Sequence, residues 1–158
     1  MKATELLKQQ HQEVKSLFEH YEQIEAEDEK QVLFEEIADS LAAHAKIEEQ
    51  IFYPEVKERA TSKQLEELVA ESYEEHHFVD MVKAEIESTP FEAEEWAAKF
   101  KVMMENIEHH AFEEEEGKMF PKVRRAFKKD ELEDMGARME ELKMQLTESL
   151  PIEERAGA

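Results

Sequence analysis

The sequence predicts an all-α protein in which four long helices pack up-down-up-down as a bundle and an additional C-terminal helix follows. Three Gly and four Pro among 158 residues leave few positions for turns, which favours a few long helices over many strands. Apolar residues recur at helical spacing in five stretches of the chain. A histidine pattern in the first half recurs in the second half, as two helical hairpins would produce.

The composition indicates one domain, residues 1–150, with a short tail at 151–158. The net charge of −21 repels nucleic acid and anionic lipid, so we expect neither as a partner. No run of about 18 apolar residues is present, and no apolar signal-peptide core follows the start, so we expect no membrane segment. The absence of Cys excludes disulfides and thiolate metal sites and fits a reducing, cytoplasmic location.

The first predicted helix covers about residues 3–25 and carries His11 toward one edge of its apolar stripe. The second covers about residues 29–59, and Pro54 is expected to kink it or end its regular part. His44 and Glu48 lie four residues apart on the apolar face of this second helix.

The third predicted helix starts near Ser62 and ends before Pro90, with His76 near the centre of its apolar face and His77 turned away. Pro90 suits the first turn of the fourth helix, with Thr89 or Ser88 as its cap.

The inner face of this fourth helix continues through His110 and Glu114, and Glu115 is the alternative carboxylate a quarter-turn or less beyond. The last predicted helix, about 129–146, has an apolar stripe that includes Leu132 and Met139. This stripe is interpreted as a lid on the bundle or, alternatively, as a dimer contact.

The pair His44-x-x-x-Glu48 places two ionisable groups where the core should be, which is costly unless something pairs with them. His110-x-x-x-Glu114 repeats the motif, and each copy is followed by a Phe and a Pro. His44 follows His11 by 33 positions, and His110 follows His76 by 34. One such pair arises easily by chance in a Glu-rich helix, but this repeated arrangement indicates a shared site.

In an up-down-up-down bundle, the four helices would bring four imidazoles and two carboxylates together. Two buried Glu carboxylates could not both stay ionised without cations. Two metal ions bridged by Glu48 and Glu114 would resolve this, and the donor set suits iron while also accepting zinc or manganese. Six donors for two ions leave open positions, and hence reactivity. The bland alternative is a metal-free bundle, in which His44→Ala leaves the stability about the same or better.

The chain resembles the hemerythrin-like proteins, also called the HHE cation-binding domain family. The resemblance rests on His11, on His44-x-x-x-Glu48 with Phe52-Tyr53-Pro54, on Glu75-His76, and on His110-x-x-x-Glu114 with Phe120-Pro121. It implies a helical bundle that holds two iron ions in an oxo- or hydroxo-bridged, non-haem di-iron centre. By this resemblance, the metal ligands are His11, His44, Glu48, His76, His110 and Glu114, with the two Glu residues as bridges.

The sequence departs from the oxygen-carrying hemerythrins, which have two His four apart on the third helix and His-x-x-x-x-Asp on the fourth. Ser72 and Asp80 stand four either side of His76, so one ligand place is left to water, Asp80, Tyr53 or Tyr73.

We therefore expect a protein that binds or senses O2 or a related small ligand. The alternatives are a di-iron enzyme acting on peroxide or nitric oxide and an iron-responsive interaction module. Catalytic residues stay unassigned, and a monomer or a homodimer is possible.

Overall fold

The computed structural model describes residues 1–148, and the predicted tail at 151–158 lies outside the described residues. Every regular element within this range is a helix, so the predicted all-helical class is confirmed. No helix in the described part of the chain is both long and apolar enough to cross a bilayer.

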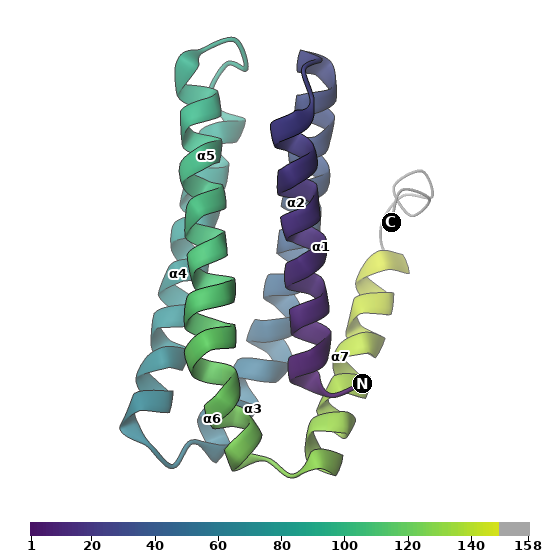
Figure 1. Ribbon diagram of the computed structural model, residues 1–158, viewed down its shortest axis with the longest axis vertical. Coiled ribbons are helices and arrows are strands. Elements are labelled where there is room, and N and C mark those ends of the chain that lie inside the picture. Colours follow the sequence, from purple (N-terminus) through teal and green to yellow (C-terminus); the bar gives the residue numbers. More distant parts are fainter. Residues whose placement is uncertain (149–158) are drawn as a thin grey trace.

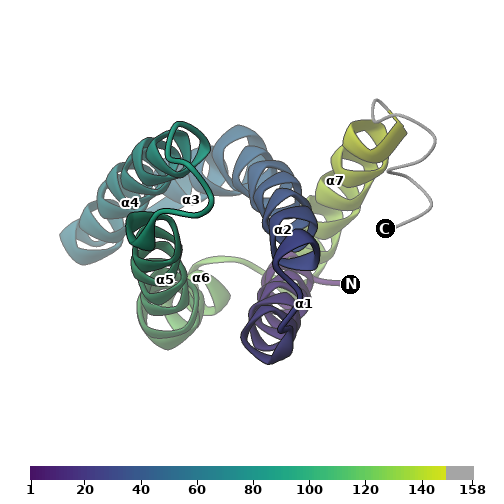
Figure 2. The ribbon, with the colours of Figure 1, turned by 90° about the horizontal axis from the view of Figure 1, so that it is seen from above.

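Two helical hairpins stand side by side (Figures 1 and 2). The first pairs α1 (Ala3–Gln23) with α2 (Glu27–Ile47), and the second pairs α4 (Lys63–Glu87) with α5 (Glu94–Glu108). The short connections place sequence neighbours antiparallel, as expected for a bundle.

The second and fourth long helices each change their winding at the same level of the fold. After α2, the π-helical segment η1 (Glu48–Phe52) leads into α3 (Tyr53–Arg59), and after α5, the π-helical segment η2 (His109–Met119) leads into α6 (Phe120–Ala126). Pro54 and Pro121 stand just inside α3 and α6. A proline lacks the N–H that an α-helix needs, so a widened turn before it is one way to keep the helix continuous.

The third predicted helix begins as expected, because the Ser62 side chain caps α4 by accepting from the Leu65 N–H at 3.2 Å. The predicted start of the fourth helix is wrong: α5 begins at Glu94, and Pro90 lies in the preceding turn, where its carbonyl accepts from the Ala93 N–H. Neither predicted cap serves α5. The hydroxyls of Ser88 and Thr89 instead donate to the Glu85 carbonyl and close the end of α4.

The core consists of two apolar clusters with a polar layer between them. One cluster is aromatic and includes Phe34, Trp96 and Phe100, while the other includes Phe52 and Phe120. His11, His44, His76 and His110 each lie, along their own helix, between a residue of one cluster and a residue of the other. The two clusters thus hold the polar layer in place and keep water from reaching it from either end.

The last helix, α7 (Lys129–Glu148), packs against α1, α2 and η1. Leu132 and Met139 are buried in the cluster that contains Phe52 and Phe120, so these two side chains are not available for the alternative dimer contact. Gly136 lets α7 approach the start of α1, since a Cβ there would lie only 2.0 Å from the Met1 carbonyl oxygen. Figure 2 shows α7 beside α1 and α2, away from the second hairpin.

Candidate metal centre

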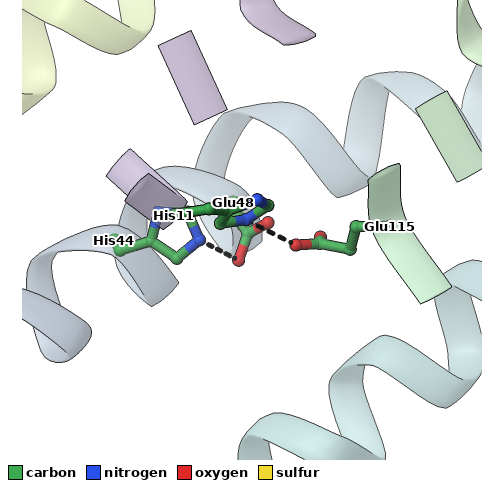
Figure 3. A group of neighbouring side chains, drawn as sticks. All are labelled: His11, His44, Glu48 and Glu115. Atoms are coloured by element: carbon green, nitrogen blue, oxygen red, sulfur yellow. Dashed lines mark hydrogen bonds and ion pairs between the residues drawn. The ribbon is translucent and has the colours of Figure 1, made fainter. Parts of the chain in front are cut away.

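Four side chains from four different segments form the first half of the polar layer (Figure 3). His11 comes from α1, His44 from α2, Glu48 from η1 and Glu115 from η2. Nε2 of His11 lies 3.1 Å from Oε1 of Glu115, and Nε2 of His44 lies 3.1 Å from Oε1 of Glu48. One ligand atom from each of the four residues lies within 4.8 Å of the others, a spacing that could hold a metal ion.

The second half consists of Glu48, His76 and His110, whose ligand atoms also lie within 4.8 Å of one another. Nε2 of His76 is 3.2 Å from Oε1 of Glu48 and 3.3 Å from Nε2 of His110. Glu48 belongs to both halves, and Oε1 of Glu115 reaches His110 Nε2 at 3.5 Å. Glu48 and Glu115 therefore each contact one imidazole of either half.

The expectation that Glu114 joins this layer is wrong, because Glu115 takes its place. Glu115 is fully buried, whereas Glu114 faces outward to Lys118 and His109 at 3.3 Å each. The reason is the π-helical winding of η2, which takes more residues per turn than the α-helix assumed from the sequence. The residue facing the layer one turn after His110 is then the fifth along the chain rather than the fourth.

Tyr53 fills part of the place left by the missing histidine. Its hydroxyl donates to Oε2 of Glu115 at 2.6 Å and lies 3.3 and 3.2 Å from Nε2 of His76 and of His110. The other candidates for this place do not reach the layer: Asp80 is exposed, and Tyr73 only packs its ring against that of Tyr53. Tyr53 reaches the interior because it follows directly on the widened turn of η1.

Each imidazole turns its Nε2 atom inward and its Nδ1 atom outward toward an acceptor. Nδ1 of His11 is 2.6 Å from Oε2 of Glu116, and Nδ1 of His44 is 2.5 Å from Oε1 of Gln10. Nδ1 of His76 and of His110 face Glu49 at 3.5 Å and Glu75 at 3.2 Å. An acceptor on Nδ1 leaves the Nε2 lone pair free for a metal ion. Glu75 stands beside His76 in the sequence motif, whereas no sequence pattern pointed to Gln10 or Glu116 as outer partners.

The electrostatics of the layer favour positive charge. Burial alone would lower the pKa of His11, but its contacts with Glu115 and Glu116 raise that pKa to about 10. Burial would also lower the pKa of His110, but the negative charge of Glu115 outweighs this effect and raises that pKa to about 9. For Glu48, burial works to raise the pKa, but His44 and His76 hold it well below its usual range.

The residues present fit bound cations. Both carboxylate oxygens of Glu48 are fully buried, and within residues 1–148 neither accepts a well-oriented hydrogen bond, although Nε2 of His44 and of His76 lie 3.1 and 3.2 Å from Oε1. Burial and the charge of Glu48 raise the pKa of Glu115, as expected for two carboxylates that share a site. Buried acceptors and clustered carboxylates of this kind are stabilised by a cation between them.

The structure brings together five of the six residues selected from the sequence, namely His11, His44, Glu48, His76 and His110. On η2, Glu115 rather than Glu114 lies in this layer, and Tyr53, one of several options for the remaining place, contacts it.

The sequence matches the family model described as the hemerythrin HHE cation binding domain over residues 2–123. It is also similar to the crystal structure of a hemerythrin HHE cation binding domain-containing protein from Mycobacterium kansasii. The two are 28% identical with a TM-score of 0.79, and the match covers 99% of this chain and 96% of that one. No curated protein matches the sequence.

Proposed function

This chain belongs to the hemerythrin HHE cation-binding domain family, and we propose that it holds two iron ions within a four-helix bundle and uses them to bind O2 or a related small ligand. The observation that carries the proposal is the convergence of four imidazole Nε2 atoms on two buried carboxylates in an otherwise apolar core. Imidazole with carboxylate suits iron, and zinc or manganese can occupy the same donors. The lack of Cys fits a cytoplasmic location, which is part of the proposal.

The proposed ligands divide into four for one ion and three for the other. His11, His44, Glu48 and Glu115 would hold the first ion, while Glu48, His76 and His110 would hold the second. When bound, two iron ions supply electrons and an open position for a small ligand. The side chains of the chain itself orient the metal, exclude water and hold the proton on the Tyr53 hydroxyl.

A small cavity supports the small-ligand part of the proposal. The cavity, of about 60 Å³, touches all four imidazoles, and apolar residues such as Val14, Phe18, Leu41 and Ile107 form much of its wall. Charged side chains also line it, namely those of Lys15, Glu75, Asp80, Lys83 and Glu108. Its small volume suits a molecule of a few atoms, such as O2, nitric oxide or hydrogen peroxide, rather than a large substrate.

A second candidate is a di-iron enzyme acting on peroxide or nitric oxide. The observation that favours it is the buried Tyr53 hydroxyl, which lies within 3.3 Å of two imidazoles and donates to Glu115. Burial and the charge of Glu115 raise the pKa of this phenol well above its usual value, so it keeps its proton at neutral pH. A positioned proton donor is what cleavage of an O–O bond requires.

In the test, the reduced, iron-loaded protein is prepared without O2 and then mixed with O2-saturated buffer while the absorption spectrum is followed. An O2 carrier gives a spectral change that reverses when O2 is removed. An enzyme instead consumes added peroxide over many turnovers, and Tyr53→Phe slows this consumption while Tyr73→Phe, a change outside the polar layer, leaves it unchanged. A loaded protein that shows neither response contradicts the small-ligand proposal.

A further inference from the structure

We infer that the two halves of the centre take up metal in a fixed order, with the half at His11 and His44 filling first because Gln10 and Glu116 hold it ready. This inference rests on the proposed function, since it requires that both halves bind metal. It assigns Gln10 and Glu116 as positioning residues, which act through the imidazoles and do not touch the metal themselves.

The first reason is the number of donors in each half. The half at His11 and His44 gathers four residues, two imidazoles and two carboxylates, around one point. The half at His76 and His110 gathers only Glu48 and the two imidazoles this closely, because Glu115 lies farther from it, 3.5 Å from His110 Nε2 against 3.1 Å from His11 Nε2. A four-donor set satisfies a single divalent ion such as Zn²⁺ on its own, whereas a three-donor set must add water or the Tyr53 phenol.

The second reason is the orientation of the imidazoles. In the first half, both Nδ1 atoms have close hydrogen-bond partners, at 2.6 Å for His11 and 2.5 Å for His44. In the second half, the Nδ1 atoms of His76 and His110 have no hydrogen-bond partner within the described residues, although carboxylates lie 3.5 and 3.2 Å away. The first pair of rings is therefore fixed before metal arrives, while the second pair must be ordered on binding.

The third reason is where the outer partners lie. Gln10 is 5% exposed, and its carbonyl oxygen contacts His44. The Glu116 side chain is 20% exposed, whereas the carboxylates facing the second half are more open, at 29% for Glu75 and 39% for Glu49. The less exposed partners of the first half have fewer side-chain positions open to them, whereas the more open carboxylates of the second half interact more with solvent.

The experiment titrates the metal-free, full-length protein with Co²⁺, followed by its visible absorption, and then with Zn²⁺ against a chromophoric chelator. Wild type is expected to bind in two steps, a tight first equivalent and a weaker second one. Gln10→Leu and Glu116→Gln are expected to weaken the first step about 10- to 100-fold, the usual effect of removing an outer partner of a ligating His. The matched controls Gln9→Leu and Glu113→Gln, both on exposed residues, are expected to leave both steps unchanged.

Two further variants identify the halves. His76→Ala should keep the tight first step and lose the second, whereas His44→Ala should lose the tight step. If a variant does not fold, wild-type protein with one equivalent of Zn²⁺ gives the same information, because the ¹⁵N imidazole signals of His11 and His44 should shift before those of His76 and His110.

Equal affinities for the two equivalents, or simultaneous shifts of all four imidazoles, would overturn the order of filling while leaving the proposed function intact. Unchanged first-step affinity in both Gln10→Leu and Glu116→Gln would overturn the positioning roles. A wild-type protein that binds no metal at all would overturn the proposed function and the inference with it.

Discussion

Glu115→Gln is the substitution that most sharply separates the structure from the sequence pattern. Glu115 is fully buried, and Oε1 reaches His11 at 3.1 Å and His110 at 3.5 Å, so its carboxylate links the two halves of the layer. Glutamine keeps the shape and can still accept from the Tyr53 hydroxyl, but it removes the negative charge. Glu114→Gln, one residue earlier, is the matched control, because Glu114 faces Lys118 and His109 instead.

The magnitude follows from Coulomb's law. A unit charge about 4 Å from a divalent ion contributes about 8 kcal/mol at an effective dielectric constant of about 20, twice the value for two unit charges. Removing Glu115 also removes its attraction for the proton on His11, 3.1 Å away, which metal must displace, and this offsets about 4 kcal/mol on the same basis. The difference, about 4 kcal/mol, corresponds to a loss of about 1,000-fold in metal affinity. Glu114→Gln should change the affinity by less than about 0.5 kcal/mol, as for an ordinary surface change.

The assay is competition for Zn²⁺ between each variant and a chelator of known affinity, with circular dichroism to confirm that both variants fold. The reasoning fails if Glu114→Gln loses as much affinity as Glu115→Gln, or more. That result would return the site to the α-helical spacing and would mean that η2 is wound differently when metal is bound.

Three other perturbations test separate parts of the account. Tyr53→Phe removes a buried hydrogen bond to a carboxylate and should lower the free energy of unfolding of the metal-free protein by about 1.5–3 kcal/mol in urea denaturation; a loss below about 0.5 kcal/mol would contradict the bond. Because the pKa of His11 is raised to about 10 and that of His110 to about 9, these imidazoles hold protons at pH 7.5 that metal must displace. Calorimetry in buffers of different ionisation enthalpy should therefore show proton release, and the metal affinity should rise with pH up to about 10, whereas a pH-independent affinity would refute this. The raised pKa of His11 also makes the stability of the metal-free fold depend on pH. This contribution is fully present at a pH below about 6.5, the pKa of His11 in the unfolded chain, and is lost as the pH rises toward 10. Gly136→Ala should destabilise the protein by about 1–3 kcal/mol despite the better helix propensity of Ala, since its Cβ would meet the Met1 carbonyl at 2.0 Å; an unchanged urea midpoint would show that α7 does not pack this closely.

Helical periodicity was sufficient to find most of the layer. His44 lies in the regular helix α2, and Glu48 follows at its end with α-helical backbone angles, so the four-residue spacing still holds there. The repeat spacing added His11, His76 and His110 to the same layer. Such predictions work where the winding is uniform, because a constant angle per residue then decides which side chains face inward.

The failures occur where the winding changes. Four successive Glu residues, Glu113 to Glu116, give the sequence no hydrophobic contrast, so only the wider turn of η2 decides that Glu115 faces the layer. The place of Tyr53 depends likewise on η1, and the role of Gln10 depends on a contact with His44, 34 positions away in the chain. The signal that could have pointed to Glu115 is the His-x-x-x-x-Asp spacing of the oxygen carriers, which His110 and Glu115 match in distance with a different acid.

Whether the centre holds two iron ions can be measured as the metal content per chain of protein made in iron-supplied cells, together with the absorption spectrum of the same sample. We expect two irons per chain with near-ultraviolet bands from an oxo bridge, and loss of these bands in Glu48→Gln. One zinc per chain, or a folded protein that never takes up metal, would contradict it, and the inward imidazoles and carboxylates would then form a charge network of the protein alone.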